Sequence, residues 1–254
     1  MEKTELNNPI IRQTILRSRI ADGTALVATA IATEFGVSTD TIRRDLLALE
    51  NDGTVQRVRG GAIPTAEPAK PFHTRLRFSE PIPDEIITAA LPAIRDGMVI
   101  LLDGGTTITQ LAHCLPRLER SLIVTPSPSV ASISLEKGIQ TILIGGRLSA
   151  NGGVAVGSDA EQAINDTASD ICFMGACGLD GAFGLSSDDI DESSLKRCMR
   201  LSSHRLIVLA TSEKLGRKAR HRTLNCDEID QIITNAGLST TSEIVSSGVD
   251  VVNV

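Results

Sequence analysis

Two adjacent arginines in the stretch 36–53 could contact phosphate groups and base edges if a helix presents them to solvent. Arg43 and Arg44 stand among apolar residues that recur with the spacing i, i+4 and i+7, namely Ile42, Leu46 and Leu49. This spacing predicts an amphipathic helix that carries the arginines on or near its polar side. Ser38 is suited to begin it, because its hydroxyl can accept a hydrogen bond from a first-turn amide. Asp40 would lie in that first turn, where the helix dipole favours a carboxylate.

A second group of residues, Gly104-Gly105-Thr106-Thr107, could bind an anion. It follows the apolar run 98–103, which predicts a strand, and the amides of Gly105, Thr106 and Thr107 would open the next helix. No lysine follows the glycines, so this is not a nucleotide P-loop. Asp103 cannot face a phosphate directly, and we expect it to fix loop amides or to accept from a sugar hydroxyl. A tight strand-to-helix turn without a ligand remains the alternative.

The elements around the arginines predict a small DNA-binding domain. Residues 26–35 predict a shorter apolar-sided helix, and Gly36 allows the tight turn of a helix-turn-helix. Residues 9–19 predict a first helix, with Arg12, Arg17 and Arg19 outward. Gly53 is suited to a left-handed helix end. In residues 54–63, Arg57 and Arg59 alternate outward beside two packing valines, Val55 and Val58, which predicts a β wing. An ordinary amphipathic helix with two solvated arginines is the alternative reading.

The remaining chain must position the glycine–threonine turn. Five prolines between residues 64 and 83, without a clear apolar period, predict a semi-rigid linker. From residue 84 onward, apolar strands alternate with helices, which predicts a mostly parallel α/β sheet buried on both faces. The expected strands are 98–103, 122–125, 140–144, 171–176, 204–210, 231–234 and 249–252. We therefore expect a DNA-binding domain at 1–65, a linker at 66–83 and an α/β ligand-binding domain at 84–254.

Composition narrows the class of protein. The 254 residues are 41% hydrophobic but only 2% aromatic, without Trp or Tyr, which argues against base-stacking on single strands. No apolar run is long enough for a membrane span and no signal peptide is evident, so a cytoplasmic protein is expected. The five cysteines lack CxxC spacing and favour reduced thiols, with no metal and no cofactor. Residues 1–65 carry eight Lys/Arg and eight Asp/Glu, so DNA binding depends on local placement rather than on bulk charge.

The arginine-bearing segment resembles the winged helix-turn-helix of the DeoR family. The likeness rests on Val37-Ser38, on residues 41–46, on Leu49-Glu50, on Gly53 and on residues 57–62. It implies a bacterial repressor that senses a sugar phosphate. The residues expected to contact double-stranded DNA are Ser38, Thr39, Asp40, Thr41, Arg43, Arg44, Arg57 and Arg59.

The C-terminal segment also resembles this family, whose sensor domain is related in fold to ribose-5-phosphate isomerase and holds phosphate at the corresponding turn. Residues 191–199 and 209–217 resemble family segments, which makes Lys196 and Lys214 candidate ligand cations. The alternatives are a Glu192–Lys196 surface pair and a solvated Lys214. The chain departs from the family at Pro126, at Thr211 and at 84–85. The effector-binding residues implied are Asp103, Gly104, Gly105, Thr106, Thr107, Thr125, Gly175, Gly178, Lys196 and Lys214.

These features together predict a transcriptional repressor controlled by a phosphorylated sugar and acting as a homodimer or homotetramer on repeated half-sites. An activator of the same architecture is an alternative. A sugar-phosphate isomerase with an accessory domain is a further alternative, because that reaction needs a carboxylate base. Asp180, Asp191 and Glu192 are available, but nothing in the sequence shows them converging with Asp103. An enzyme is therefore not expected.

Overall fold

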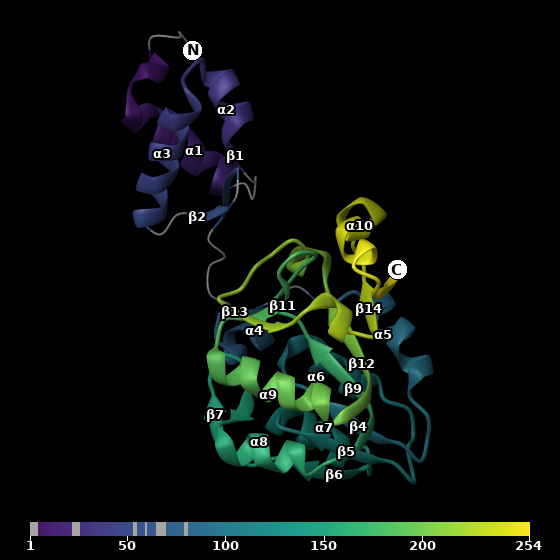
Figure 1. Cartoon of the computed structure of the whole chain (residues 1–254). Coiled ribbons are helices and arrows are strands. Elements are labelled where there is room, and N and C mark those ends of the chain that lie inside the picture. Colours follow the sequence, from purple (N-terminus) through teal and green to yellow (C-terminus); the bar gives the residue numbers. More distant parts are fainter. Residues whose placement is uncertain (1–4, 22–25, 53–54, 59, 65–69, 79–80) are drawn as a thin grey trace. The chain divides into compact units, whose positions relative to one another are not determined.

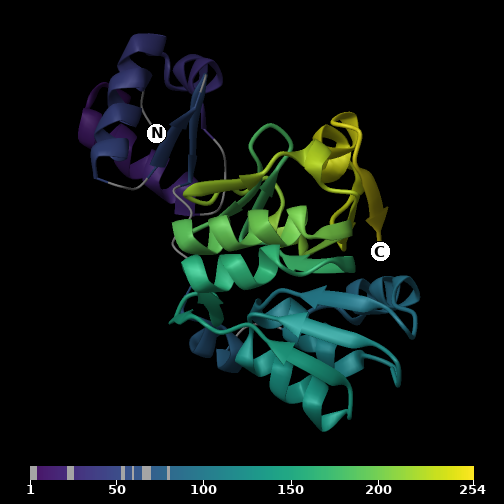
Figure 2. The same ribbon diagram turned by 60° about the horizontal axis from the view of Figure 1, so that its bottom comes forward.

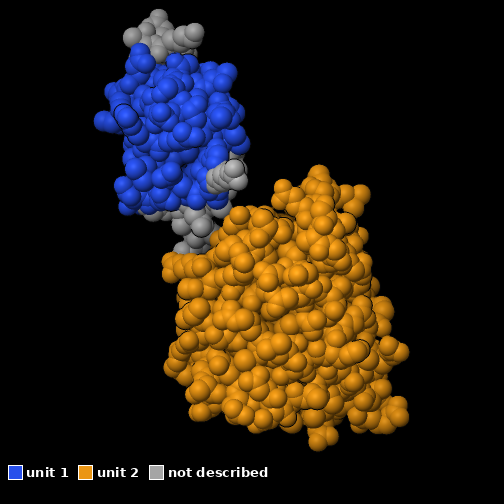
Figure 3. All heavy atoms as spheres, in the orientation of Figure 1, with its two compact units in different colours: residues 1–67 blue, residues 68–254 orange. Residues whose placement is uncertain are grey.

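The computed structural model describes residues 5–21, 26–52, 55–58, 60–64, 70–78 and 81–254 (Figure 1). The chain divides into two compact units, residues 1–67 and residues 68–254, which are coloured separately in Figure 3. In the described part of the chain, no helix combines the length and apolar character that crossing a membrane requires.

The first unit is a winged helix-turn-helix, as the sequence predicted. Its helices are α1 (Pro9–Ala21), α2 (Ala28–Phe35) and α3 (Thr39–Asn51), preceded by a short 3-10 turn at Glu5–Asn7. Strands β2 (Val55–Val58) and β3 (Gly61–Pro64) form an antiparallel wing, and β1 (Leu26–Val27) adds a third strand beside β3. The sequence analysis missed β1, because two residues are too short to show a period. Gly53, the expected helix end, lies outside the described residues.

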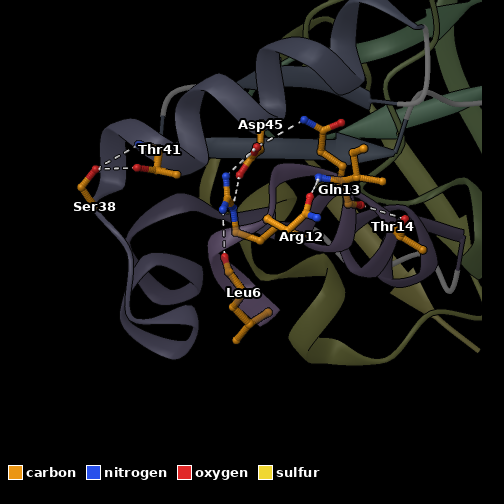
Figure 4. Close-up of polar contacts among 9 residues, drawn as sticks. Leu6, Arg12, Gln13, Thr14, Ser38, Thr41 and Asp45 are labelled. Atoms are coloured by element: carbon orange, nitrogen blue, oxygen red, sulfur yellow. Dashed lines mark hydrogen bonds and ion pairs between the residues drawn. The ribbon is translucent and has the colours of Figure 1, made fainter. Parts of the chain in front are cut away.

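Arg12 corrects one expectation about this unit, because it is buried rather than outward-facing. Its guanidinium Nε lies 2.6 Å from Oδ2 of Asp45 on helix α3, and its Nη1 donates to the carbonyl of Leu6 at 2.8 Å (Figure 4). Arg12 shares a helix face with the fully buried Leu16, and the carboxylate that compensates its charge is supplied from far along the chain. Ile10, an apolar residue of the same helix, is 72% exposed.

The second unit confirms the expected α/β class. Seven parallel strands form one sheet in the order β15-β14-β12-β9-β4-β5-β6. Their bounds are β4 (Val99–Leu102), β5 (Leu122–Thr125), β6 (Gln140–Leu143), β9 (Ser169–Gly175), β12 (Ser203–Ala210), β14 (Gln231–Thr234) and β15 (Asp250–Asn253). The chain first builds outward from β4 through β5 to β6, and then builds the other way from β9. The neighbouring strands β4 and β9 therefore mark the topological switch point, where ligands bind in open α/β sheets.

Helices cover both faces of this sheet. Helices α5 (Asp84–Ala90), α6 (Gly105–Cys114) and α7 (Pro128–Glu136) share one apolar core with Ile100 and Phe173. Helices α8 (Ser158–Asn165), α9 (Ile190–Leu201) and α10 (Leu238–Ser246) share the other core with Leu101 and Cys172. Figure 2 shows α8 and α9, in green, together on one side. Neighbouring residues of one strand thus enter opposite cores, as the period of two in a strand requires.

Four smaller features were not expected from the sequence. Strands β7 (Arg147–Ser149) and β8 (Val154–Val156) form an antiparallel ribbon, and β10 (Gly178–Asp180), β11 (Gly184–Ser187) and β13 (His221–Leu224) form a separate small sheet. Short 3-10 turns occur at Leu91–Ala93, Ser212–Lys214 and Cys226–Glu228. Within the expected linker, residues Phe72–Phe78 form helix α4, whose Phe72 amide donates to the carbonyl of Ala150 at 2.9 Å. The flanking prolines concealed this helix, because they suggested irregular backbone throughout.

Candidate functional site

Helix α3 presents its polar side to solvent. Ser38 caps it, since its Oγ accepts from the Thr41 amide at 3.1 Å and lies 2.8 Å from the Thr41 hydroxyl (Figure 4). Arg43 and Arg44 are both exposed, and Nη1 of Arg43 lies 2.9 Å from Oδ1 of Asp40. An exposed pair of this kind contributes at most about 1 kcal/mol, so Arg43 can exchange its partner for a phosphate.

The wing lies next to this helix and adds a third exposed cation, Arg57. Its backbone amide donates to Oε1 of Glu50 at 3.1 Å, which ties the wing to the end of α3. A hollow of about 210 Å³ is lined by Thr39, Arg43 and Arg57, together with residues of α2 and the wing turn. The first unit therefore gathers cations from α3 and the wing around one concave surface. Arg59 lies outside the described residues.

The second unit contains a larger cavity, of about 460 Å³, at the carboxyl ends of strands β4, β9 and β12. It opens where the sheet order reverses, which is the position expected for a ligand. Its lining comes from helix α4 and the segment 81–83, the turn after β4, the loop between β7 and β8, the turn after β9, helix α9 and the segment after β12. A volume of this size suits a small organic molecule.

The glycine–threonine turn forms one wall of the cavity and opens helix α6. Gly105 has a φ of +86°, a left-handed conformation that L side chains rarely adopt. Gly104 is packed so closely that a Cβ there would lie 2.3 Å from Cγ1 of Val154. No described side chain caps α6, so the amides of its first turn, from Thr106 onward, keep their positive end available for an anion.

Asp103 and Lys196 form a buried ion pair behind this turn. Nζ of Lys196 lies 2.7 Å from Oδ2 of Asp103 and donates to the carbonyl of Gly175 at 2.6 Å. The same carboxylate oxygen accepts from the Gly175 amide at 3.1 Å. Burial alone would lower the pKa of Lys196, but the nearby negative charges, above all Asp103, outweigh it and raise that pKa. Lys196 therefore stays protonated and locks the turns after β4 and β9 together.

Glu192 lies one helical turn before Lys196 and is also buried, so the two do not form the surface pair that the sequence left open. Oε1 of Glu192 accepts from the Ser149 hydroxyl at 2.7 Å. Burial raises the pKa of the Glu192 carboxyl above its usual range, although the Ser149 bond and Lys196 oppose this shift. Glu192 faces the cavity and can accept a hydrogen bond from a hydroxyl-bearing ligand.

The cavity brings together most of the residues predicted to bind an effector. Those that line it are Asp103, Gly104, Gly105, Thr106, Thr107, Gly175, Lys196 and Lys214. Thr125 and Gly178 do not line it. Thr125 is fully buried and its Oγ1 accepts from the Ser127 amide, and a Cβ on Gly178 would lie 2.5 Å from the carbonyl of Arg217. Lys214, whose side chain is 25% exposed, lies 3.0 Å from Oε1 of Glu213.

Sequence reasoning missed the residues that the supposed linker contributes to this cavity. Lys70 and Arg75 line it from the segment around α4, together with Phe78. The basic character of this segment was the only signal available, and the prolines on either side outweighed it. The carboxylates considered for isomerase chemistry do not gather here. Asp180 pairs with Lys218 and Asp191 with Arg147, and of the three only Glu192 lines the cavity.

Comparison with known families identifies both units. The model of the DeoR-like helix-turn-helix domain matches residues 12–66, and the model of the DeoR C-terminal sensor domain matches residues 84–236. This chain belongs to the DeoR family. It is therefore a DNA-binding transcriptional regulator with a helix-turn-helix unit and a sensor unit, as the sequence predicted.

Individual relatives of this DeoR-family chain regulate transcription. It is 30% identical to the HTH-type transcriptional regulator GlpR of Haloferax volcanii, over 96% of this chain and 98% of the relative. It is 30% identical to the HTH-type transcriptional repressor GlcR of Bacillus subtilis, over 81% and 80%. It is 26% identical to the L-fucose operon activator of Escherichia coli K12, over 92% and 98%.

A solved D-ribose-5-phosphate isomerase in complex with phospho-erythronic acid has a weak structural likeness to this DeoR-family chain. The TM-score is 0.38 and the sequence identity is 19%, over 51% of each chain. A likeness this low bears on neither the fold nor the function.

Proposed function

We propose that this DeoR-family regulator is a sequence-specific repressor whose affinity for DNA is set by a phosphorylated sugar bound in the cavity of its second unit. The observation that carries this proposal is the uncapped N-terminus of α6 at the edge of that cavity. A helix N-terminus attracts a phosphate dianion through its unpaired amides and its dipole. Thr106 and Thr107 add hydroxyl donors beside those amides.

The remainder of the cavity fits the sugar part of such a ligand. Glu192 and Glu213 line it with carboxylates that can accept hydrogen bonds from sugar hydroxyls. Phe78, Pro81 and Ile82 add apolar surface on the side of the segment that leads into α5. A cavity with a few polar groups set among apolar ones is typical of small-molecule sites.

DNA binding is assigned to the exposed polar side of α3 and to the wing. We propose that Thr39, Arg43 and Arg44 contact base edges in the major groove and that Arg57 contacts the phosphate backbone. Residues 1–65 have no net charge, so one copy of this unit has little non-specific attraction for DNA. A homodimer or homotetramer on repeated half-sites would supply the missing affinity.

Repression is favoured over activation by the name of the Bacillus relative, which is 30% identical. The fucose relative is named as an activator, so activation by the same architecture is the second candidate function. Both require DNA binding that responds to a ligand. They differ in where the bound protein lies relative to the polymerase site. Transcription assays distinguish them, because adding the purified protein lowers transcription for a repressor and raises it for an activator.

The DNA-binding assignment is tested with the double variant Arg43→Ala/Arg44→Ala. The wild-type protein first selects its binding sequence from a random DNA pool, and gel shifts then compare affinities for that sequence. We expect the variant to lose roughly tenfold or more in affinity, because each good base or phosphate contact contributes about 1–3 kcal/mol.

The matched control is Arg117→Ala/Arg120→Ala, which removes two exposed arginines from the second unit. It should bind the selected DNA like the wild type, and circular dichroism should show that all three proteins are folded. If the Arg43/Arg44 variant binds the selected DNA with wild-type affinity, the assignment of α3 to the DNA-binding surface is wrong.

A further inference from the structure

The cations that line the sensor cavity are not equivalent, because some of them are already neutralised. The cavity-lining cations are Lys70, Arg75, Lys196 and Lys214. Lys196 lies 2.7 Å from the Asp103 carboxylate, and Lys214 lies 3.0 Å from the Glu213 carboxylate. Either lysine must share its charge between its carboxylate and any incoming anion. Lys196 is held in a buried pair, and Lys214 must give up its Glu213 partner to bind an anion, so a cation without a carboxylate partner is more readily available than either.

Arg75 differs because its described hydrogen bonds go to neutral carbonyl groups. Its Nε donates to the carbonyl of Lys70 at 2.9 Å, and its Nη2 donates to the carbonyl of Asn151 at 2.6 Å. Among the residues that the structure describes, no carboxylate lies within ion-pair distance of Arg75. These bonds fix the guanidinium plane without cancelling its charge, which leaves the charge available to a ligand.

The position of Arg75 also favours contact with an anion at helix α6. A Cβ built on Gly105 would lie 4.0 Å from Nη1 of Arg75, so this nitrogen faces the turn that opens the helix. Arg75 is half-buried, and its guanidinium lies 6.0 Å from the centre of the Phe72 ring. Lys70 is exposed, so water screens its charge more strongly. A planar guanidinium also matches the oxygens of a phosphate better than an ammonium does.

We propose that Arg75 binds the phosphate of the effector directly, opposite the first-turn amides of α6. This inference deepens the proposed function and depends on it. It assigns the principal phosphate cation to a helix outside the α/β sheet, in a segment whose sequence predicts only a linker.

Arg75 also connects ligand binding to the segment that leads from the DNA-binding unit. Helix α4 is held on the loop between β7 and β8 by the Phe72 amide, which donates to Ala150, and by Arg75, which donates to Asn151. The Phe72 ring packs against Gly153, where a Cβ would lie 2.3 Å from its Cδ1 atom. The first unit ends at residue 67 and α4 begins at Phe72. An anion held by Arg75 therefore strengthens the attachment of helix α4 to the loop between β7 and β8.

The test measures binding of inorganic phosphate and of D-ribose 5-phosphate to the full-length protein by calorimetric titration at constant ionic strength. The variants are Arg75→Gln, Arg75→Lys, Thr107→Glu at the first turn of α6, and the matched control Arg77→Gln. Arg77 lies on the same helix, is exposed and does not line the cavity. We expect Arg75→Gln to weaken binding about tenfold or more, because it removes hydrogen bonds to a charged group. Arg75→Lys should fall between that variant and the wild type, and Arg77→Gln should bind like the wild type.

The possible results separate this inference from the proposed function. If Arg75→Gln binds both probes like the wild type while Thr107→Glu does not bind them, the role of Arg75 is wrong and the phosphate site remains. If the wild type binds neither probe, both the proposal of a phosphorylated effector and the proposed role of Arg75 are wrong. If thermal unfolding shows that Arg75→Gln is not folded, Arg75→Lys decides: weaker binding than wild type supports the role, and equal binding overturns it.

Discussion

At the scale of single residues, two buried ion pairs join elements that lie far apart in the sequence. The Arg12–Asp45 pair joins helices α1 and α3 inside the DNA-binding unit, and the Asp103–Lys196 pair joins the turn after β4 to helix α9 in the sensor unit. Each pair connects residues far apart in the sequence. From the sequence, Arg12 was expected to be exposed, Asp45 had no assigned role, and Lys196 was a ligand cation or a surface partner, because a local pattern does not reveal a partner supplied by another element.

Glu192 gives a prediction about pH. Burial raises its pKa above the ordinary value of 4.5, so the folded state favours the protonated carboxyl. Its contribution to stability is present at acid pH and is lost as pH rises through the raised pKa. We therefore expect Glu192→Gln, which stays neutral, to gain stability relative to the wild type as pH rises above 4.5.

Urea unfolding of both proteins between pH 4.5 and 8 measures this difference. The Gln side chain keeps an acceptor for the Ser149 hydroxyl, so that hydrogen bond is preserved. A stability difference that is constant with pH, or one that shifts toward the wild type at higher pH, would show that Glu192 is not held near its neutral form.

At the scale of elements, the sequence predicted the parts with a strong period. The seven strands of the main sheet appear near their expected positions, and helices α5 to α10 alternate with them as expected, because apolar runs and helical spacing extend over enough residues to be recognised. The short strands β1, β7, β8, β10, β11 and β13 were missed, since each has only two to four residues and most of them are not continuous apolar runs. Helix α4 was missed because seven residues between prolines resemble a linker. The largest omission at the candidate site, Arg75, follows from that one error.

The turn between β4 and α6 gives a prediction at this scale. A Cβ on Gly104 would lie 2.3 Å from Cγ1 of Val154 and 3.3 Å from the carbonyl of Gly152, so Gly104→Ala must displace strand β8 or the turn itself. We expect a loss of about 1–3 kcal/mol in the free energy of unfolding, as for other overpacked sites. Phosphate binding should weaken as well, because the first-turn amides of α6 move with the turn.

Gly145→Ala is the control for this change. No heavy atom lies within 4 Å of a Cβ built there, and its φ does not fall in the left-handed region. Denaturant unfolding and phosphate titration of the two variants make the comparison. If Gly104→Ala is as stable as Gly145→Ala and binds phosphate equally well, close packing at the turn does not shape the site.

At the scale of the whole molecule, the two units carry separate parts of the function. The DNA-binding unit has its own apolar core around Leu16, Ile42 and Leu46, and the sensor unit has two cores on the faces of its sheet. Communication between the units requires an element that belongs to the sensor cavity and continues into the DNA-binding unit. Helix α4 lines the sensor cavity and is the first described element after the DNA-binding unit, so under the proposed function the signal passes through this part of the chain.

The central claim is that a ligand bound in the sensor cavity controls the affinity of the protein for DNA. The most direct measurement is the dissociation constant of the full-length protein for its selected DNA, with and without each of a panel of phosphorylated sugars. We predict that at least one of them changes this constant by about 5- to 150-fold, the range of typical allosteric coupling. The unphosphorylated sugars should have no effect, and Thr106→Glu/Thr107→Glu should bind DNA normally without responding. A wild-type protein that ignores the whole panel, or an acidic variant that still responds, would contradict the account.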